Sequence, residues 1–285
     1  MASFFDDLGR EVEREWIRSN VREVDFSKIC ADVLARRPPS EEVSLDDVIA
    51  QGLGPERLVR QLNADSEFGQ PAITVFANEQ FLISVLFWLE GTTNIHEHAF
   101  SGAFHVLHGQ SLNTTFSFEE QRAVNEHLKL GILRENSPEL LHRGAIREIR
   151  SEGGLVHSGG ATIHSLFHLA HPSATVLVRT YRASVARPQY TYWRPGIACN
   201  IDCDRKELKT EGTMMSLVYR TSPERFPEFV HGWLVNTDFT SGFLGLLRCL
   251  SIASPEEGDE LLARVDRTMR SSRATRARLF AANRS

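Results

Sequence analysis

Two histidines spaced two residues apart in a strand-like stretch constrain this chain more than any other feature. His96 and His98 lie in a β-like segment framed by Gly91 and Gly109. Side chains at positions i and i+2 of a strand leave the same face, so the two imidazoles point together while Glu97 points away. Such a pair supplies two neighbouring positions in the coordination sphere of one metal ion. The stretch therefore predicts part of a metal site built on a β-sheet.

A third ligand has to come from another part of the chain, and a second glycine-led segment offers two candidates. His164 and His168 follow Gly159 and Gly160 on another strand-like run. The two histidines have the same strand parity, so either side chain could face the metal. Strand spacing alone leaves both open as the third ligand.

The two segments resemble the metal motifs of the cupin superfamily. The first reads G-x4-H-x-H-x10-G and the second reads G-x3-H-x3-H, and the resemblance covers roughly residues 80–182. Cupins usually carry a glutamate shortly after the second histidine of the first motif, where this chain has Gly102 and Ala103. Three histidines without that glutamate resemble the thiol dioxygenases of the cysteine dioxygenase type, which are mononuclear non-heme iron enzymes.

The resemblance implies a ligand set. His96 and His98 match the first two iron ligands, and His164 matches the third. His168 stands where cupins usually carry an asparagine, so it is a substitute ligand, a donor lining the pocket, or a packed core histidine.

Two further residues resemble part of the wall of the dioxygenase pocket. Tyr181 matches a tyrosine of those enzymes, while Arg179 replaces the histidine that stands two residues before it. The guanidinium of Arg179 is a candidate clamp for a carboxylate, which it can bind through two parallel hydrogen bonds. The hydroxyl of Tyr181 could donate to a bound substrate or oxygen. The alternatives are a surface salt bridge for Arg179 and a core position for Tyr181.

Three imidazoles leave the full charge of a dication in the pocket and the remaining coordination positions open, which suits Fe(II). We therefore expect an iron-dependent oxygenase that acts with dioxygen on a small polar substrate, either thiol-bearing or amino-acid-like. Two alternatives stay open. One is a metal-dependent isomerase, lyase or hydrolase, and the other is a non-catalytic sensor or interaction protein with a structural metal.

The pattern of apolar, polar and turn-forming residues along the chain predicts a mainly β protein with helices at both ends. Amphipathic spacing predicts a helical subdomain over residues 1–68. Short strands separated by Gly and Asn predict a double-sheet jelly roll over 69–220, with its last strand at 214–219 and a helical insert near 119–150. This is the fold that the resemblance to cupins implies. Capping signals predict helices over 221–285.

Charge and composition limit the kinds of partner that we expect for this chain. A net charge of −5 argues against general nucleic-acid binding. The longest apolar run, Phe81–Leu89, is too short to cross a membrane. Four scattered cysteines do not make a disulfide framework. We expect a cytoplasmic protein without nucleic-acid or membrane partners, for which a homodimer is one possible state.

Overall fold

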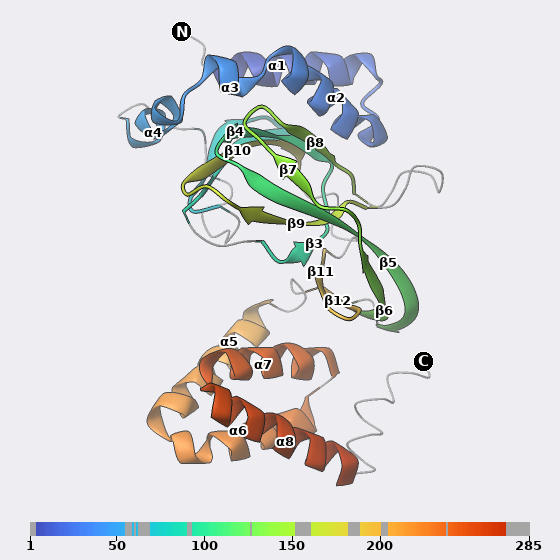
Figure 1. The fold of residues 1–285 in the computed structure, drawn as a ribbon, viewed down its shortest axis with the longest axis vertical. Helices are drawn as coiled ribbons and strands as arrows, with labels where there is room; N and C mark the ends of the chain where they lie inside the picture. Colours follow the sequence, from blue (N-terminus) through green and yellow to red (C-terminus); the bar gives the residue numbers. More distant parts are fainter. Residues whose placement is uncertain are drawn as a thin grey trace. The chain divides into compact units, whose positions relative to one another are not determined.

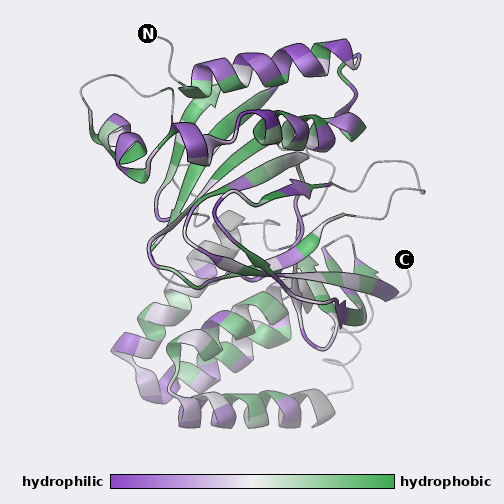
Figure 2. Ribbon diagram, turned by 45° about the horizontal axis from the view of Figure 1, so that its top comes forward, coloured by the Kyte–Doolittle hydropathy of each residue, from purple (hydrophilic) through white to green (hydrophobic). Residues whose placement is uncertain are grey.

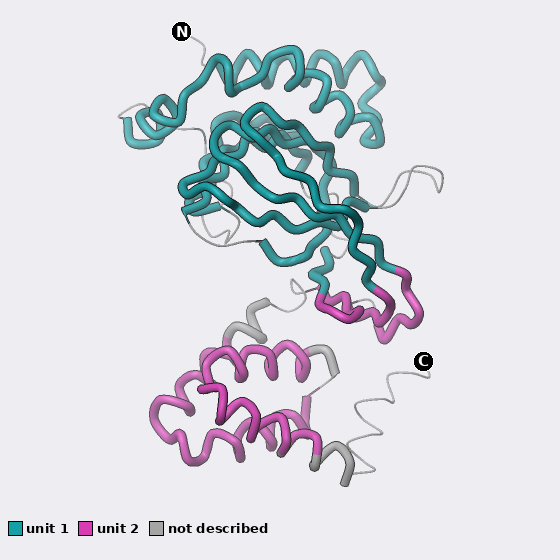
Figure 3. Tube along the Cα trace, viewed as in Figure 1, with its two compact units in different colours: residues 1–118, 133–192 teal, residues 119–132, 193–285 magenta. Residues whose placement is uncertain are grey.

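A computed structural model of the chain divides into two compact units, which we describe separately (Figure 3). The first contains residues 1–118 and 133–192, and the second contains residues 119–132 and 193–285. The structure describes residues 4–54, 59, 61, 69–89, 93–125, 127–151, 161–181, 189–200, 205–237 and 239–271. Gly91, Gly159 and Gly160, which frame the predicted motifs, lie outside these ranges.

The first unit begins with four helices among its described residues. They are α1 (Phe4–Arg18), α2 (Glu23–Arg36), α3 (Pro39–Glu42) and α4 (Leu45–Leu53). Helix α2 ends just before two prolines, which cannot continue it. Ser44 caps α4: its hydroxyl accepts from the Asp47 N–H, and the Asp47 carboxylate accepts from the Ser44 N–H.

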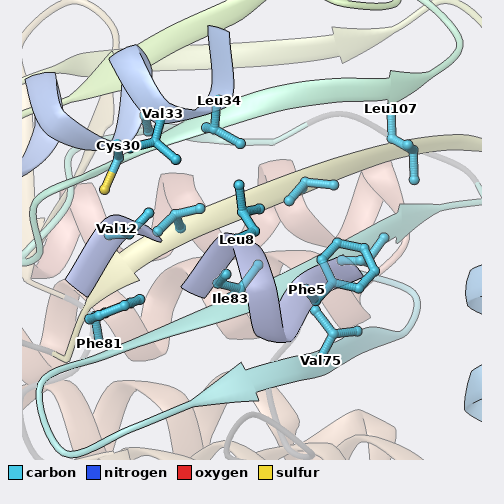
Figure 4. Close-up of a cluster of buried hydrophobic side chains, with 14 of the residues drawn as sticks. Phe5, Leu8, Val12, Cys30, Val33, Leu34, Val75, Phe81, Ile83 and Leu107 are labelled. Carbon is cyan, nitrogen blue, oxygen red and sulfur yellow. The ribbon is translucent and has the colours of Figure 1, made fainter. Parts of the chain in front are cut away.

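Helices α1 and α2 cover one face of the first sheet (Figure 1). This antiparallel sheet has the order β1-β2-β10-β4-β8, and its strands are β1 (Ala72–Ala77), β2 (Phe81–Trp88), β10 (Ser173–Thr180), β4 (Gly102–His108) and β8 (Ile146–Ile149). Alternate residues of β2, such as Phe81 and Ile83, pack against Leu8 and Val12 of α1 and Leu34 of α2 (Figure 4). Figure 2 shows these strands as mostly hydrophobic beneath helices with many hydrophilic residues.

The second sheet of this unit faces the other side of the first. Its order is β11-β3-β9-β5-β7, with β11 (Tyr190–Trp193), β3 (Ile95–His96), β9 (Ile163–His168), β5 (Ser111–Asn125) and β7 (Glu139–Leu141). Side chains of both sheets form one buried apolar cluster: Phe104, Val106, Leu141, Ile149, Leu166 and Leu177. Two facing antiparallel sheets with flanking helices are the jelly roll that the sequence predicts.

The second unit combines a strand pair with a group of helices. Residues 119–132 form the outer part of the hairpin of β5 and β6 (Leu128–Glu135), and β12 (Ile197–Asn200) pairs with β6. The helices are α5 (Arg205–Thr221), α6 (Phe226–Asn236), α7 (Phe239–Ile252) and α8 (Pro255–Ser271), with the short 3₁₀ helix η1 (Pro223–Arg225) before α6. Their buried core contains Met215, Phe226, Val230, Cys249 and Leu261.

Two sequence predictions are wrong here. The helical insert near 119–150 is strand in the structure, because it contains the outer half of β5 and all of β6, β7 and β8. From Ser117 onward β5 has no buried residue, so the strand lacks the alternation that would have identified it.

The expected last strand at 214–219 lies within helix α5. Met215, Val218 and Tyr219 share its core-facing side at helical spacing, and a short apolar run does not distinguish that pattern from a strand. In the part of the chain that the structure describes, no helix is long and apolar enough to cross a membrane.

Candidate metal centre

Three histidines meet in the first unit where β3 and β9 lie side by side. His96 of β3 and His164 of β9 are directly paired across the two strands. His98 follows β3, beyond its end at His96. Each residue offers one ring nitrogen, and these three atoms lie within 4.8 Å of one another. The structure therefore brings the three predicted ligands together, and all three are buried.

Hydrogen bonds on the far side of two rings determine which nitrogen carries a proton. Nδ1 of His96 lies 2.7 Å from the carbonyl oxygen of Asn94, and Nδ1 of His164 lies 3.1 Å from Oδ1 of Asn113. Both oxygens are acceptors, so each Nδ1 carries the proton and each Nε2 keeps a lone pair. Nε2 of His98 lies 3.0 Å from Nε2 of His164. Ring nitrogens that converge in this way fit a shared metal ion.

Burial keeps these imidazoles neutral. Removal from water lowers the pKa of His96 to about 4. Burial, and then repulsion from His96 when it is protonated, lowers the pKa of His164 to about 3. The pKa of His98 falls well below its usual range, first through burial and then through the neighbouring His96 and His164. The neutral form is the one that binds metals, so the three side chains are ready to bind one at neutral pH.

Glu97 points away from the histidines, as strand alternation predicts. It is buried, and its carboxylate accepts a 2.7 Å hydrogen bond from the hydroxyl of Tyr192 and a 3.4 Å bond from the N–H of Tyr190. Both tyrosines belong to β11, the neighbour of β3. Glu97 therefore joins β3 to β11. Tyr192 had no signal in the sequence, because its position depends on how the strands pair.

The structure leaves no room for a glutamate at Gly102 or Ala103, the two positions considered after the second histidine. Gly102 starts β4 so close to β10 that a Cβ atom there would lie 2.9 Å from Cα of Arg179 and still closer to the carbonyl oxygen of Val178. Ala103 faces the opposite core, beneath helices α1 and α2. Neither position can present a carboxylate to His96, His98 and His164.

Arg179 is linked to the histidines by the ring of Phe100, which lies next to both Arg179 and His98. Its guanidinium carbon is 4.9 Å from the ring centre of Phe100, and this ring lies 4.6 Å from the ring of His98. The positive charge of Arg179 also contributes to the lowered pKa of His98. Of the two predicted wall residues, Arg179 is the one that lies near the three histidines.

Tyr181 and His168 lie away from this group. The hydroxyl of Tyr181 donates to the carbonyl oxygen of Asn78, in the turn between β1 and β2. His168 ends β9, and Leu166, which belongs to the apolar cluster between the sheets, stands between it and His164 on the same face. The two histidines of the second motif are therefore separated by apolar packing.

The ring of His168 is fixed by neighbours from both sheets. It stacks on Trp88 of β2, with ring centres 4.6 Å apart. Its Nδ1 lies 2.9 Å from the hydroxyl of Ser111 on β5 and 2.8 Å from the hydroxyl of Ser173 on β10. Since β5 and β10 belong to different sheets, His168 joins the two layers of the jelly roll.

Comparisons with known proteins found only distant similarity to solved structures. The sequence matches no protein-family model and no curated protein. A cupin 2 conserved barrel domain protein from Rhodopseudomonas palustris is 13% identical with a TM-score of 0.28, over 49% of this chain and 72% of that chain. Hydroquinone 1,2-dioxygenase from a Sphingomonas species is 17% identical with a TM-score of 0.30, over 42% and 71%. A structure of DMSP lyases is 15% identical with a TM-score of 0.32, over 57% and 77%. Similarity at this level carries no argument about activity.

Proposed function

We propose that this protein is a non-heme iron oxygenase that binds one Fe(II) through His96, His98 and His164. One observation carries the proposal: three buried, neutral imidazoles converge within 4.8 Å in a group that contains no carboxylate among the described residues. A set of neutral ligands leaves the charge of the metal uncompensated, which favours an anionic substrate as a further ligand. The resemblance to thiol dioxygenases of the cysteine dioxygenase type supports the same chemistry.

The residues around the histidines would bind and shield the substrate. Bound Fe(II) would supply open positions for substrate and dioxygen. Phe100 lies against His98, and the ring of Phe104 lies 6.2 Å from that of His164, so aromatic side chains limit access of water to the ligands. Arg179, whose guanidinium lies over the ring of Phe100, would bind a carboxylate group of the substrate.

This arrangement favours a small substrate that carries both a metal-binding group and a carboxylate. A thiol or amine would bind at the metal, while the carboxylate would pair with Arg179. Amino acids and small mercapto acids combine these groups. We therefore propose them as the substrate class, with dioxygen as the second substrate.

Metal content and oxygen uptake test the proposal together. We expect the purified protein to contain iron, or to take up one Fe(II) per chain under anaerobic conditions, and to consume oxygen with one or more members of a panel of small thiols and amino acids. The His98→Ala variant is the matched control and should do neither. A protein that binds only zinc and consumes no oxygen with any panel member would contradict the oxygenase and favour non-oxidative chemistry.

A further inference from the structure

A row of three side chains leads from His164 toward the surface of the first unit. Oδ1 of Asn113 lies 3.1 Å from Nδ1 of His164, and Nδ2 of Asn113 donates to Oε1 of Glu139 at 2.8 Å. Glu139 in turn accepts from Nε of Arg147 at 2.7 Å and from the second guanidinium nitrogen of the same side chain. Asn113 is buried, whereas the side chains of Glu139 and Arg147 are 38% and 41% exposed.

The charge of Glu139 determines which atom donates and which accepts in each hydrogen bond of this row. An ionised carboxylate only accepts hydrogen bonds, so the atom of Asn113 that faces Glu139 has to be the amide nitrogen. The amide oxygen then faces His164 and requires a proton on Nδ1. Hydrogen bonding to Arg147 holds the pKa of Glu139 below its usual value, which keeps the carboxylate ionised. Each side chain therefore fixes the orientation of the next.

We infer that Glu139 and Arg147 are positioning residues that fix the tautomer of His164, with its proton on Nδ1 and the lone pair of Nε2 available to a metal. The consequence for metal binding rests on the proposed metal site, but the tautomer itself is a property of the metal-free chain. Outer hydrogen bonds of this kind hold the orientation of metal-binding histidines and raise their affinity.

His96 also has a hydrogen bond on the far side of its ring, but this bond needs no further side chain to orient it. Nδ1 of His96 donates to the backbone carbonyl of Asn94, which cannot turn into a donor. The amide of Asn113 can turn over and present either its oxygen or its nitrogen to His164. A charged residue beyond Asn113 removes this ambiguity. The ion pair of Glu139 and Arg147 therefore has a role in orienting His164, whereas His96 requires no such pair.

The test reads the tautomer directly in the metal-free protein. In protein labelled with ¹⁵N-histidine, the ring nitrogens of His164, assigned by comparison with His164→Gln, should show a single tautomer protonated at Nδ1. Glu139→Gln replaces the carboxylate by an amide that can donate or accept. We expect this variant to give a mixture of both tautomers and to bind Zn²⁺ about tenfold more weakly, with an unchanged circular dichroism spectrum.

Two further variants separate the contributions. Glu148→Gln is the matched control, because Glu148 lies next to Arg147 on β8 but pairs with Arg150, just beyond the strand, and has no hydrogen bond to Asn113 among the described residues. It should leave both the tautomer and the affinity for Zn²⁺ unchanged. Asn113→Leu removes the acceptor itself and should give mixed tautomers whatever stands at position 139.

The outcomes distinguish this inference from the proposed oxygenase. A pure Nδ1-protonated tautomer in Glu139→Gln would overturn the role of the ion pair, and the same result in Asn113→Leu would overturn the whole row. Absence of oxygen consumption would count against the oxygenase alone, because neither the tautomer nor Zn²⁺ binding depends on it.

Discussion

His96 and His164 lie directly opposite each other on two adjacent antiparallel strands. β3 is only two residues long, so bonds beside it contribute to this register. Thr93 donates its N–H to the carbonyl oxygen of Leu166 at 2.9 Å, and its hydroxyl accepts from the Leu166 N–H at 2.8 Å. On the other side of His96, the N–H of Glu97 donates to β11. The distance between two of the proposed ligands thus depends on Thr93 and Glu97, which are not ligands themselves.

Removal of the Thr93 hydroxyl should weaken metal binding without touching a ligand. Thr93→Val keeps the shape of the side chain but leaves the buried N–H of Leu166 without its acceptor, which we expect to cost about 1–3 kcal/mol of unfolding free energy. The affinity for Zn²⁺ should fall with it, because β3 and β9 are less firmly paired. Thr114→Val, on the partly buried outer face of β5, provides a control that should change neither quantity. Unchanged zinc affinity in Thr93→Val would show that the register is held by the sheet as a whole.

The two histidines of the second motif should give opposite results. His164→Ala should abolish binding of one metal per chain, since it removes one of three ligands. His168→Ala should retain the metal but lower the free energy of unfolding by about 1–3 kcal/mol, because Ser111 and Ser173 lose their buried hydrogen-bond partner. Metal titration and urea unfolding measure the two effects. Metal loss in His168→Ala with retention in His164→Ala would move the third ligand along β9.

Substitutions of Arg179 and Tyr181 should have different effects, although the two residues are only two positions apart. Arg179→Met should raise KM for a carboxylate substrate by about tenfold or more, the equivalent of losing a charged hydrogen bond worth about 1.5–3 kcal/mol. Tyr181→Phe removes only the hydrogen bond to Asn78 and should lower stability by about 1 kcal/mol while leaving KM and kcat unchanged. Steady-state oxygen uptake with the active substrate measures both variants. Equal KM values in wild type and Arg179→Met would remove Arg179 from substrate binding.

The stability of the metal-free protein should fall as the pH drops below about 6.5. Burial lowers the pKa of His105, which lies beneath the N-terminal helices, to about 4. Between the folded value near 4 and the unfolded value of 6.5, the unfolded chain binds more protons, so acid favours unfolding. The contribution of His105 is complete above pH 6.5 and decreases by up to about 1.4 kcal/mol per pH unit as the pH falls toward 4.

The variant His105→Gln isolates this contribution. It keeps an acceptor for the N–H of Ser40, which bonds to Nε2 of His105 at 3.3 Å, but it does not titrate. Urea unfolding in the presence of a chelator at pH 7.5, 6 and 5 should show a shallower decrease for the variant than for the wild type. Parallel decreases would mean that His105 does not contribute to acid unfolding.

Local spacing was enough to predict how the histidines point, because the alternation of side chains along a strand does not depend on the rest of the fold. It predicted that His96 and His98 point together and that Glu97 points away, and the structure agrees. The spacing could not distinguish His164 from His168, since both side chains leave the same face of β9. Apolar packing at Leu166 separates them, and that depends on the opposite sheet.

The residues that sequence analysis missed are all placed by strand pairing. Asn113 and Glu139 are register partners on β5 and β7, and the segment that contains β7 was expected to be helical. Once this segment was assigned wrongly, no sequence argument could bring Glu139 next to the site. Asn113 gave no signal of its own, because Ser111 and Thr115 on the same face of β5 are also polar. Its role depends on the partner that strand pairing places beside it.

Gly102 offers the sharpest test of how closely β4 approaches β10, the central strand of the first sheet. A Cβ at this position would overlap the backbone of β10 at Val178 and Arg179, and backbone cannot move aside as a flexible side chain can. We expect Gly102→Ala to lower the free energy of unfolding by about 1–3 kcal/mol or more and to weaken metal binding, since only three residues separate His98 from the start of β4. Gly232→Ala, in the middle of helix α6, is the matched control. Among the described residues, no atom outside its own helix backbone and chain neighbours lies within 4 Å of the added methyl group, so the substitution should stabilise the protein by about 0.5–1 kcal/mol. Urea unfolding of the two variants decides the matter: a Gly102→Ala protein as stable as wild type would show that the strands can separate, and that the glutamate of cupins is missing here for a reason other than space.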